Sequence, residues 1–153
     1  MGEDMNKLDG LDSNFRARVE SALAEMERDA ELKHLGVQKI IIVEGLRTLT
    51  TQLAYYCRGR MKNSADVKAI FNAAGLWALT DKEAVTPSTW TLKSRHLEGK
   101  AVDIAPSRDG KTIWWDAPEA VWARMGAIGQ SHGLVWGGAW QDKHDLPHFE
   151  EPE

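Results

Sequence analysis

The sequence holds a single cysteine, Cys57, among 153 residues. One cysteine allows neither an internal disulfide bond nor a zinc cluster built from several thiolates. Any metal ion must therefore be bound by histidine, aspartate or glutamate side chains, and Cys57 itself is expected to be a small buried apolar residue. Long apolar runs are also lacking. The run from Ile40 to Val43 is far too short to cross a bilayer, so we expect no stable membrane insertion.

We recognise neither a targeting signal nor a basic segment in this sequence. The first residues, Met1-Gly2-Glu3-Asp4-Met5, contain neither a basic stretch nor an apolar core, so we expect no signal peptide and accumulation in the cytoplasm. The formal net charge is -4, and no long run of lysine and arginine is present. This charge pattern disfavours nucleic acid as a partner.

A length of 153 residues suits one compact domain. We expect residues 1–10 to be a loose leader and residues 11–153 to form a single domain, because the sequence shows no internal repeat and no linker. The apolar spacing predicts helices at 13–35, 48–60, 64–74 and 117–132, and strands at 37–44, 101–105, 134–136 and 148–150. These elements define an α+β fold, with helices mostly early and short strands mostly late.

Three local features of this fold are specific expectations. Asp116 should cap the last helix, with Pro118 in its first turn. Pro106 should end the strand that begins at Ala101. Residues 76–95 should be irregular, with short extended pieces around Val85 and Trp90.

Two short segments contain the residues that suggest chemistry. One is Ser94-Arg95-His96-Leu97-Glu98-Gly99-Lys100-Ala101-Val102-Asp103, and the other is Asp145-Leu146-Pro147-His148-Phe149-Glu150. They supply two imidazoles and a carboxylate as metal ligands (His96, His148 and Asp103), with a second carboxylate, Asp145, three residues before the last histidine. Three protein ligands, an open position for water and a base for its proton are the parts of a catalytic zinc site.

The spacing of the first two ligands fits a strand better than a helix. His96 and Asp103 are seven residues apart, which is two helical turns, but Gly99 lies between them and disfavours a helix. The segment from 101 to 105 instead alternates in the manner of a strand, so Asp103 shares a face with two alanines. These small side chains leave room for a metal beside the carboxylate, and His96 would reach that metal from the preceding turn.

The third ligand comes from a distant segment, and its surroundings leave alternatives open. Pro147 keeps the preceding residue extended, so Asp145 can lie at the mouth of the site. The competing ligands are His144, Asp142 and Glu150. We expect His144 to be exposed, and Glu150, which shares a strand face with His148, is a candidate for orienting that imidazole.

These motifs resemble the D-alanyl-D-alanine / L-alanyl-D-glutamate zinc peptidase family, whose relatives include the hedgehog signalling domain and lysostaphin-type peptidases. Three further segments extend the resemblance over roughly residues 37–150. They are Glu44-Gly45-Leu46-Arg47-Thr48 with Gln52, Tyr56-Cys57-Arg58-Gly59-Arg60, and Gly137-Gly138-x-Trp140. The nearest subgroup is the phage endolysins that cut between L-Ala and D-Glu in peptidoglycan.

The resemblance implies a small antiparallel sheet that carries the zinc site, with helices packed on it. It implies that His96, Asp103 and His148 bind Zn²⁺ and that Asp145 acts as general base and then general acid. Arg47 would be the electrophilic partner of the substrate carbonyl or of a substrate carboxylate. The residues expected to contact the substrate are Ser94, Gln52, Trp140 and Trp136, although core packing is an equally good explanation for the two tryptophans.

The implied function is that of a monomeric zinc endopeptidase acting on the peptidoglycan stem peptide. As a phage endolysin it would accumulate in the host cytoplasm and reach the cell wall at lysis. Two alternatives remain open: a D-Ala-D-Ala carboxypeptidase or dipeptidase, and a non-catalytic hedgehog-like zinc module that binds peptide or protein. The stretch from 62 to 93 departs from the endolysin subgroup.

Overall fold

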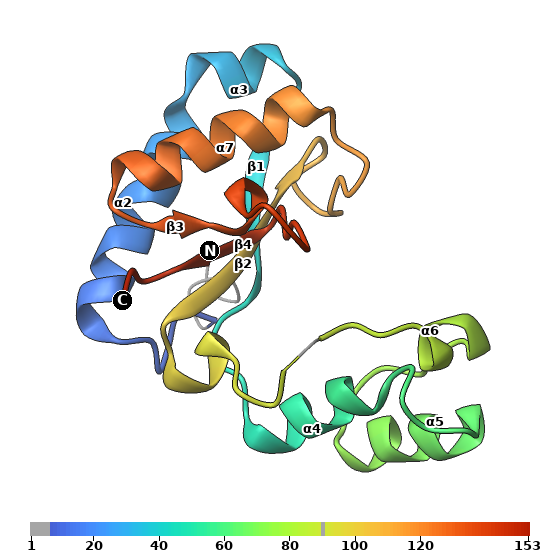
Figure 1. Ribbon diagram of the computed structural model, residues 1–153. Helices are drawn as coiled ribbons and strands as arrows, with labels where there is room; N and C mark the ends of the chain where they lie inside the picture. The colour runs from blue at the N-terminus through green and yellow to red at the C-terminus, as the bar shows by residue number, and fades with distance from the viewer. Residues whose placement is uncertain (1–6, 90) are drawn as a thin grey trace. The chain divides into compact units, whose positions relative to one another are not determined.

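The computed structural model describes residues 7–89 and 91–153. The chain forms two compact units, and the colour bar of Figure 1 lets the reader find the residues of each. The first unit combines Met1–Leu46 with Glu98–Glu153, and the second is Arg47–Leu97. The α+β class predicted from the sequence is confirmed, because helices pack on an antiparallel sheet of four strands.

The sheet belongs to the first unit. Its strands are β1 (Lys39–Glu44), β2 (Ala101–Ser107), β3 (Val135–Trp136) and β4 (His148–Glu150). They lie in the order β1-β2-β4-β3, and every neighbouring pair is antiparallel. In this register Asp103 of β2 lies directly opposite His148 of β4. Strand pairing therefore brings two of the expected ligands together although they are 45 residues apart.

Pro106 does not end its strand, contrary to expectation. It pairs with Ile40 of β1 inside β2, and the reason lies in the length of β4. The Ile104 amide donates to the Pro147 carbonyl oxygen at 2.9 Å, so the nitrogen two residues later points to the same side. The pairing between β2 and β4 ends at Asp103 and His148, so β4 does not reach Pro106. A proline at this position therefore removes no hydrogen bond between strands.

The predicted helix at 13–35 is divided into α2 (Ser13–Arg28) and α3 (Ala30–His34). Asp29 separates them because its carboxylate accepts the Leu32 amide at 3.0 Å and so caps the second helix. The same carboxylate forms a two-point contact with Arg124 of α7 (Glu119–Ser131), at 2.7 and 3.1 Å. This contact supports the capped geometry, in which the chain turns between the helices.

Replacing Asp29 with alanine should lower the free energy of unfolding by about 1–3 kcal/mol, because the change removes a helix cap and the acceptor for a charged donor. Arg124 holds the pKa of Asp29 below its ordinary value of 3.8. The contribution of Asp29 to stability should thus be complete above that pH and be lost as the pH falls below it. Urea unfolding at neutral and acidic pH measures both effects.

Glu31→Ala is the matched control for this prediction. Glu31 contacts the same arginine at 3.2 Å, but its side chain is 58% exposed whereas that of Asp29 is 10% exposed. An exposed ion pair contributes about 0–1 kcal/mol, so this variant should stay close to the parent protein. Equal losses for the two variants would show that the cap contributes nothing.

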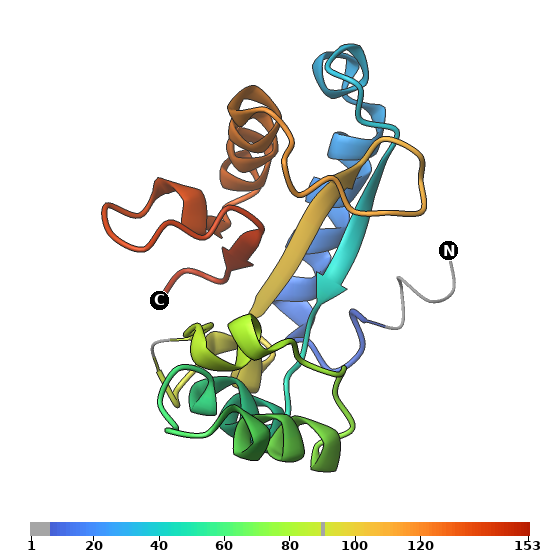
Figure 2. The ribbon, with the colours of Figure 1, turned by 90° about the vertical axis from the view of Figure 1, so that its right-hand side faces the viewer.

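The core of the first unit follows the predicted helical stripe. Buried side chains of α2 are Phe15, Val19, Ala22 and Met26, and those of α7 include Val121, Trp122, Met125 and Ile128. Figure 2 shows α2 behind the long strands β1 and β2. On α7, Gly126 and Gly129 allow close approach, because a side chain there would collide with the rings of Trp136 and Phe149. These glycines bring the helix down onto the strands that precede and carry His148.

Two expectations about the first unit are wrong. The last helix begins at Glu119, and Pro118 rather than Asp116 occupies the capping position, where it makes no side-chain cap. Residues 7–10 are not a loose leader: Leu8 is fully buried, and the Lys7 ammonium donates to the Ile42 carbonyl oxygen at 3.1 Å. Leu8 lies between Lys7 and Asp9 in a mainly polar segment, and this polarity led to the expectation of a leader. The rest of the expected leader, residues 1–6, lies outside the described residues.

The second unit is helical and has its own small core. Its helices are α4 (Leu49–Cys57), α5 (Ser64–Ala73) and α6 (Asp81–Val85), and its buried apolar residues are Ala54, Val67, Phe71, Leu79 and Ala84. The helix α6 corrects the expectation of an extended piece at Val85. Thr80 and Glu83 form a complete capping box at its start, a signal that the sequence contains. The piece expected around Trp90 includes a position outside the described residues.

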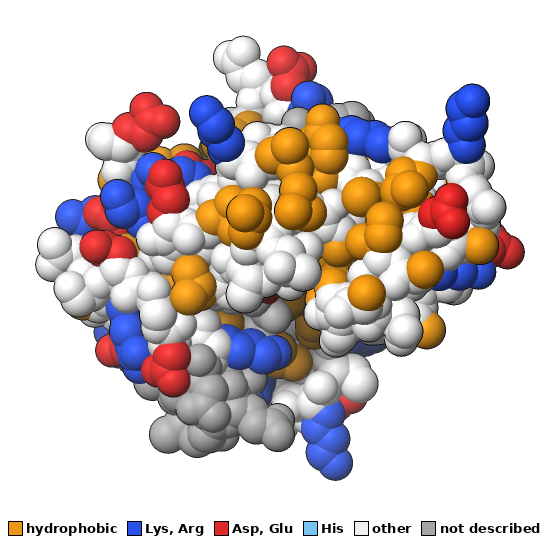
Figure 3. Space-filling model, turned by 90° about the horizontal axis from the view of Figure 1, so that it is seen from below, with side chains coloured by type: hydrophobic (Ala, Val, Ile, Leu, Met, Phe, Trp, Pro, Cys, Tyr) orange, Lys and Arg blue, Asp and Glu red, His pale blue; other side chains and the backbone are white. Residues whose placement is uncertain are grey.

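Large apolar side chains of this second unit also reach its surface. Those at least about one-third exposed are Leu49, Leu53, Met61, Trp77, Val85 and Leu92. Figure 3 shows hydrophobic side chains gathered on the face seen from below, with charged side chains of both signs around them. Cys57 is only half-buried. Within the described residues, no helix combines the length and the apolar character needed to span a membrane.

Candidate metal and catalytic site

Each expected ligand is placed by a different element. His96 lies on the short 3-10 helix η1 (Arg95–Glu98), Asp103 on β2 and His148 on β4. Between the first two, Gly99 has a φ of 69°, a backbone conformation that glycine adopts without strain. This residue turns the chain from η1 into β2, and its Cα approaches the Gly10 carbonyl oxygen too closely to leave room for a side chain.

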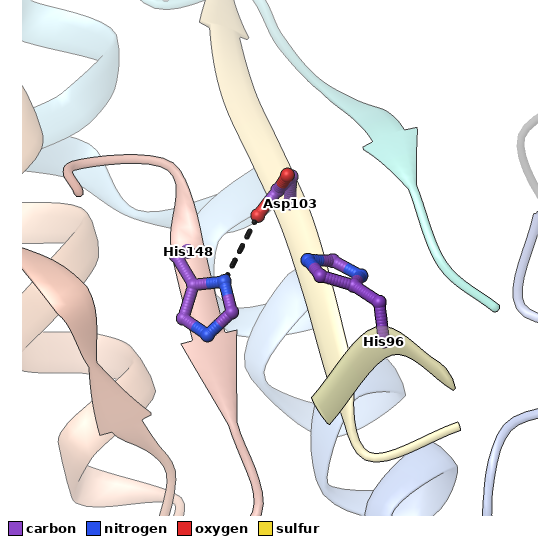
Figure 4. Close-up of side chains that lie close together, drawn as sticks. All are labelled: His96, Asp103 and His148. Carbon is purple, nitrogen blue, oxygen red and sulfur yellow. Dashed lines mark hydrogen bonds and ion pairs between the residues drawn. The ribbon is translucent and has the colours of Figure 1, made fainter. Parts of the chain in front are cut away.

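The three side chains converge (Figure 4). One ligand atom from each of His96, Asp103 and His148 lies within 4.8 Å of the others. The two histidines are buried, at 2% and 7% exposure, and Asp103 is half-buried. The residues that the sequence put forward as ligands therefore lie together, with atoms close enough to share one ion. Their binding of a metal stays a prediction.

The imidazole of His148 is held from two sides. Its Nε2 lies 2.8 Å from Glu150 Oε1, and its Nδ1 lies 3.2 Å from Asp103 Oδ1. Glu150 thus takes the orienting role that was open from the sequence, since a carboxylate that accepts from Nε2 leaves Nδ1 to act as a metal ligand. Nδ1 is the nitrogen that faces the second carboxylate of the site, Asp145, at 3.9 Å.

The site favours positive charge. Burial lowers the pKa of His148, but its hydrogen bonds to Asp103 and Glu150 and the nearby charge of Asp145 outweigh burial and raise it to about 9. A pocket that stabilises a buried imidazolium in this way will also stabilise a divalent cation in the proton's place. Two imidazoles and a carboxylate are a donor set suited to zinc with an open position. The residues present therefore fit a catalytic zinc ion.

Asp145 lies beside this donor set and also contacts solvent. Its carboxylate is 48% exposed, while its backbone is anchored: the Asp145 amide donates to the Gly137 carbonyl oxygen at 3.1 Å, and the His148 amide donates to the Asp145 carbonyl oxygen at 3.2 Å. Gly137 has to be glycine because a side chain there would meet Asp145 and His148. This close approach explains the first glycine of the pair that precedes the last ligand, and a side chain at the second, Gly138, would collide with the ring of Trp136.

The two tryptophans near these glycines have different places. Trp136 donates from Nε1 to the Leu146 carbonyl oxygen at 2.7 Å and stacks on Phe149 with centroids 6.5 Å apart. Its ring packs against the core, so the structure favours packing over the expected contact with substrate. The ring of Trp140 lies 5.2 Å from that of His148. Trp140 therefore remains a candidate wall for the substrate.

In the second unit, Arg47 is connected to the ligand segment. Its backbone amide donates to the His96 carbonyl oxygen at 3.0 Å. Its guanidinium donates from Nη1 to Gln52 Oε1 at 2.6 Å and lies over the ring of Tyr55, 4.8 Å from the centroid. The contact with Tyr55 was missed from the sequence. The signal was present, since Gln52 and Tyr55 are three residues apart on α4 and so share a helix face.

Gln52 and Ser94, two residues expected to contact the substrate, are both engaged by the protein itself, and a contact of Ser94 with substrate stays a prediction. Gln52 is fully buried, with both ends of its amide engaged by the protein. The Ser94 hydroxyl accepts the His96 amide at 3.2 Å, so this side chain shapes the turn that presents His96. Both residues act on neighbouring parts of the site.

The other two competing ligands, His144 and Asp142, are not part of the ligand cluster. His144 is exposed, as expected, and its Nδ1 lies 3.1 Å from the Gly138 carbonyl oxygen. Asp142 is exposed. Among the described residues, His96, Asp103 and His148 form the one group of three or more His, Cys, Asp or Glu side chains with metal-binding spacing.

Comparison with known proteins agrees with this site. Residues 87–151 match a peptidase M15 family model described as D-alanyl-D-alanine carboxypeptidase, and this segment contains all three ligands and Asp145. Among solved structures, the chain is similar to the Serratia marcescens L-Ala D-Glu endopeptidase ChiX, with a TM-score of 0.58 over 97% of this chain and 86% of that chain. The two are 20% identical in sequence, so this likeness shows a shared fold. The fold predicted from the motifs is confirmed, and the match over residues 87–151 agrees with the predicted family.

Proposed function

Because this chain carries a peptidase M15 domain, we propose that it is a zinc endopeptidase that hydrolyses the L-alanyl-D-glutamate bond of peptidoglycan stem peptides. One observation carries the proposal: three metal-ligand atoms lie within 4.8 Å of one another, with the carboxylate of Asp145 3.9 Å from the imidazole of His148. A metal site with a solvent-exposed acid beside it is built for hydrolysis, since mere binding needs no base.

Each residue of the site has a part in this reaction. His96, Asp103 and His148 would hold the ion. When bound, zinc lowers the pKa of a water ligand to about 7 and polarises the scissile carbonyl. Asp145 then accepts the proton of the attacking water and passes it to the leaving amine. Its exposure of 48% lets water reach the carboxylate, and its anchored backbone keeps the carboxylate beside the ligands.

Arg47 is the second positive group of the proposed reaction. A guanidinium stabilises the negative charge that develops on a carbonyl oxygen, and it also binds carboxylates. The backbone hydrogen bond from Arg47 to the carbonyl oxygen of His96 ties its position to the ligand segment. We therefore propose that Arg47 contacts the scissile carbonyl or the carboxylate of the D-glutamate residue.

The charge of the second unit supports an acidic substrate. Its basic residues are Arg47, Arg58, Arg60, Lys62, Lys68, Lys82, Lys93 and Arg95, and its acidic residues are Asp66, Asp81 and Glu83. Eight basic against three acidic residues is a large excess in a chain whose net charge is -4. Stem peptides are rich in carboxylates, and a basic surface attracts such a ligand. The excess includes the stretch from 62 to 93 that departs from the endolysin subgroup.

The biological role that we propose is that of a phage endolysin, made in the host cytoplasm and released to the cell wall at lysis. The support is the likeness of its motifs to the phage subgroup that cuts between L-Ala and D-Glu. A lysis assay on chloroform-treated Gram-negative cells tests this role separately from the bond specificity.

The bond specificity is tested by digestion of purified peptidoglycan with the zinc-loaded protein, followed by mass spectrometry of the fragments. We expect new amino termini on D-glutamate. Release of free D-alanine would instead support the second candidate, a D-Ala-D-Ala carboxypeptidase, which the description of the matching family favours. A zinc-loaded protein that releases neither product would indicate a non-catalytic zinc module.

A further inference from the structure

We infer that Gln52 is a positioning residue that orients the guanidinium of Arg47 through a neutral hydrogen bond. The inference deepens the proposed function and rests on the role proposed there for Arg47. Gln52 lies on α4 and is fully buried. A buried amide must satisfy its polar atoms within the protein, and the partners of Gln52 reveal its role.

The network around Gln52 allows one orientation of its amide. Its Nε2 donates to the Thr91 carbonyl oxygen at 2.6 Å and to Thr89 Oγ1 at 3.2 Å. A carbonyl oxygen can only accept, so the NH₂ group must face Thr91. This leaves Oε1 directed at Arg47, whose guanidinium can only donate, and the Nη1–Oε1 distance is 2.6 Å. Reversing the amide would place donor against donor and acceptor against acceptor.

Two further contacts complete the control of Arg47. The ring of Tyr55 lies 4.8 Å from Cζ, so it supports one face of the guanidinium plane. The backbone amide of Arg47 is bonded to the His96 carbonyl oxygen at 3.0 Å. The His96 carbonyl oxygen thus restrains the backbone of Arg47, the ring of Tyr55 restrains the plane of its guanidinium, and Gln52 restrains one edge of that group.

The choice of a neutral acceptor has a consequence for the chemistry. A carboxylate at this position would pair with the guanidinium and reduce the field that Arg47 exerts on a substrate. A glutamine oxygen restrains the same edge and adds no negative charge of its own beside the guanidinium. Gln52 therefore prepares Arg47 to stabilise negative charge without touching the substrate itself, because no part of its side chain reaches the surface.

A double-mutant cycle on the zinc-loaded protein tests the inference. The variants are Gln52→Met, Arg47→Ala and the combination of both, with kcat and KM measured on a soluble stem-peptide fragment. Gln52→Met should lower kcat by about 10- to 100-fold, the range for loss of a hydrogen bond to a charged group, with little change in KM or zinc content. In the Arg47→Ala background the same change should cost less than about twofold. Equal losses in both backgrounds would overturn the inference.

Thr89→Val is the matched control, since it removes the longer partner of Gln52 Nε2 and leaves the bond to Arg47 in place. It should retain most of the kcat of the parent protein. A loss as large as that of Gln52→Met would mean that Gln52 matters for the Thr89–Thr91 segment rather than for Arg47, and would also overturn the inference.

Arginine side-chain NMR provides a readout that does not depend on activity. Restricted rotation of the Arg47 guanidinium should give resolved Nη protons in the parent protein and averaged ones in Gln52→Met. An Arg47 signal that is the same in Gln52→Met and in the parent protein refutes the inference, whether or not the protein cuts peptidoglycan. A parent protein that cuts no peptidoglycan refutes the proposed function alone. Should Gln52→Met fail to fold, Gln52→Glu keeps the size and the acceptor that faces Arg47, although it loses the donor to Thr91. The Gln52→Glu variant should show resolved Arg47 Nη protons and a reduced kcat. Averaged Nη protons in this variant would count against Gln52 as the positioning residue.

Discussion

Replacing Asp145 with asparagine is expected to lower kcat for peptidoglycan hydrolysis by about 10²- to 10⁴-fold, the usual contribution of a general base. The amide keeps the size of the side chain but cannot accept the proton of the attacking water. The zinc content should be unchanged, because the ligand cluster consists of His96, Asp103 and His148 and does not include Asp145. Release of stem-peptide fragments and metal analysis of the same preparation give the two numbers.

Asp142→Asn is the matched control for this experiment. Asp142 is an exposed carboxylate in the same loop, three residues before Asp145, so its loss changes the local charge equally without touching the site. It should keep the activity of the parent protein. Loss of zinc from Asp145→Asn would show that base and ligand have been misassigned, and full activity would exclude Asp145 as the base.

Removing the metal ion should have the largest effect of all. We expect a chelator to lower hydrolysis by about a thousandfold or more, since the water loses its acidity and the carbonyl its polarisation, and we expect added zinc to restore it. His96→Ala should reproduce the loss without a chelator. The ring of His96 is buried, at 2% exposure, so its removal also opens a cavity, and circular dichroism must accompany the assay.

Glu150→Gln distinguishes a ligand from a residue that orients one. Glu150 contacts Nε2 of His148 at 2.8 Å, so this variant should still bind zinc, with an affinity reduced by about 10- to 100-fold. A titration of the metal-free protein with zinc measures the difference. Zinc binding by His96→Ala as tight as that of Glu150→Gln would be incompatible with His96 as a ligand.

The sequence alone was sufficient to name the three candidate metal ligands that the structure brings together. Alternation around Asp103 predicted a strand, and the structure has that strand at Ala101–Ser107. The histidines before and after it were put forward from residue type and spacing, and their atoms converge with that of Asp103 to within 4.8 Å. Such patterns can be recognised from the sequence because strand periodicity and glycine breaks depend on residues that are adjacent in the chain.

Other features depended on partners that are distant in the chain. Pro106 stays in its strand because β4 ends before reaching it. Asp29 divides a helix with the support of Arg124, 95 residues away. Leu8 enters the core although its own segment is polar. In each case a tertiary contact overrides the local preference, and no local pattern announces such a contact.

The sequence by itself thus determined the α+β class, the peptidase motifs of residues 87–151 and the set of residues able to hold an ion, because these follow from local periodicity and from the types of side chain present. Only the tertiary structure decided which contacts the neighbouring polar and aromatic side chains make. It turned Gln52 from an expected substrate contact into a buried support for Arg47, directed Trp136 into packing, and made Glu150 the partner of His148. The physical reason is that the role of a polar or aromatic side chain depends on its burial and hydrogen-bond partners, which exist only once distant segments have packed together.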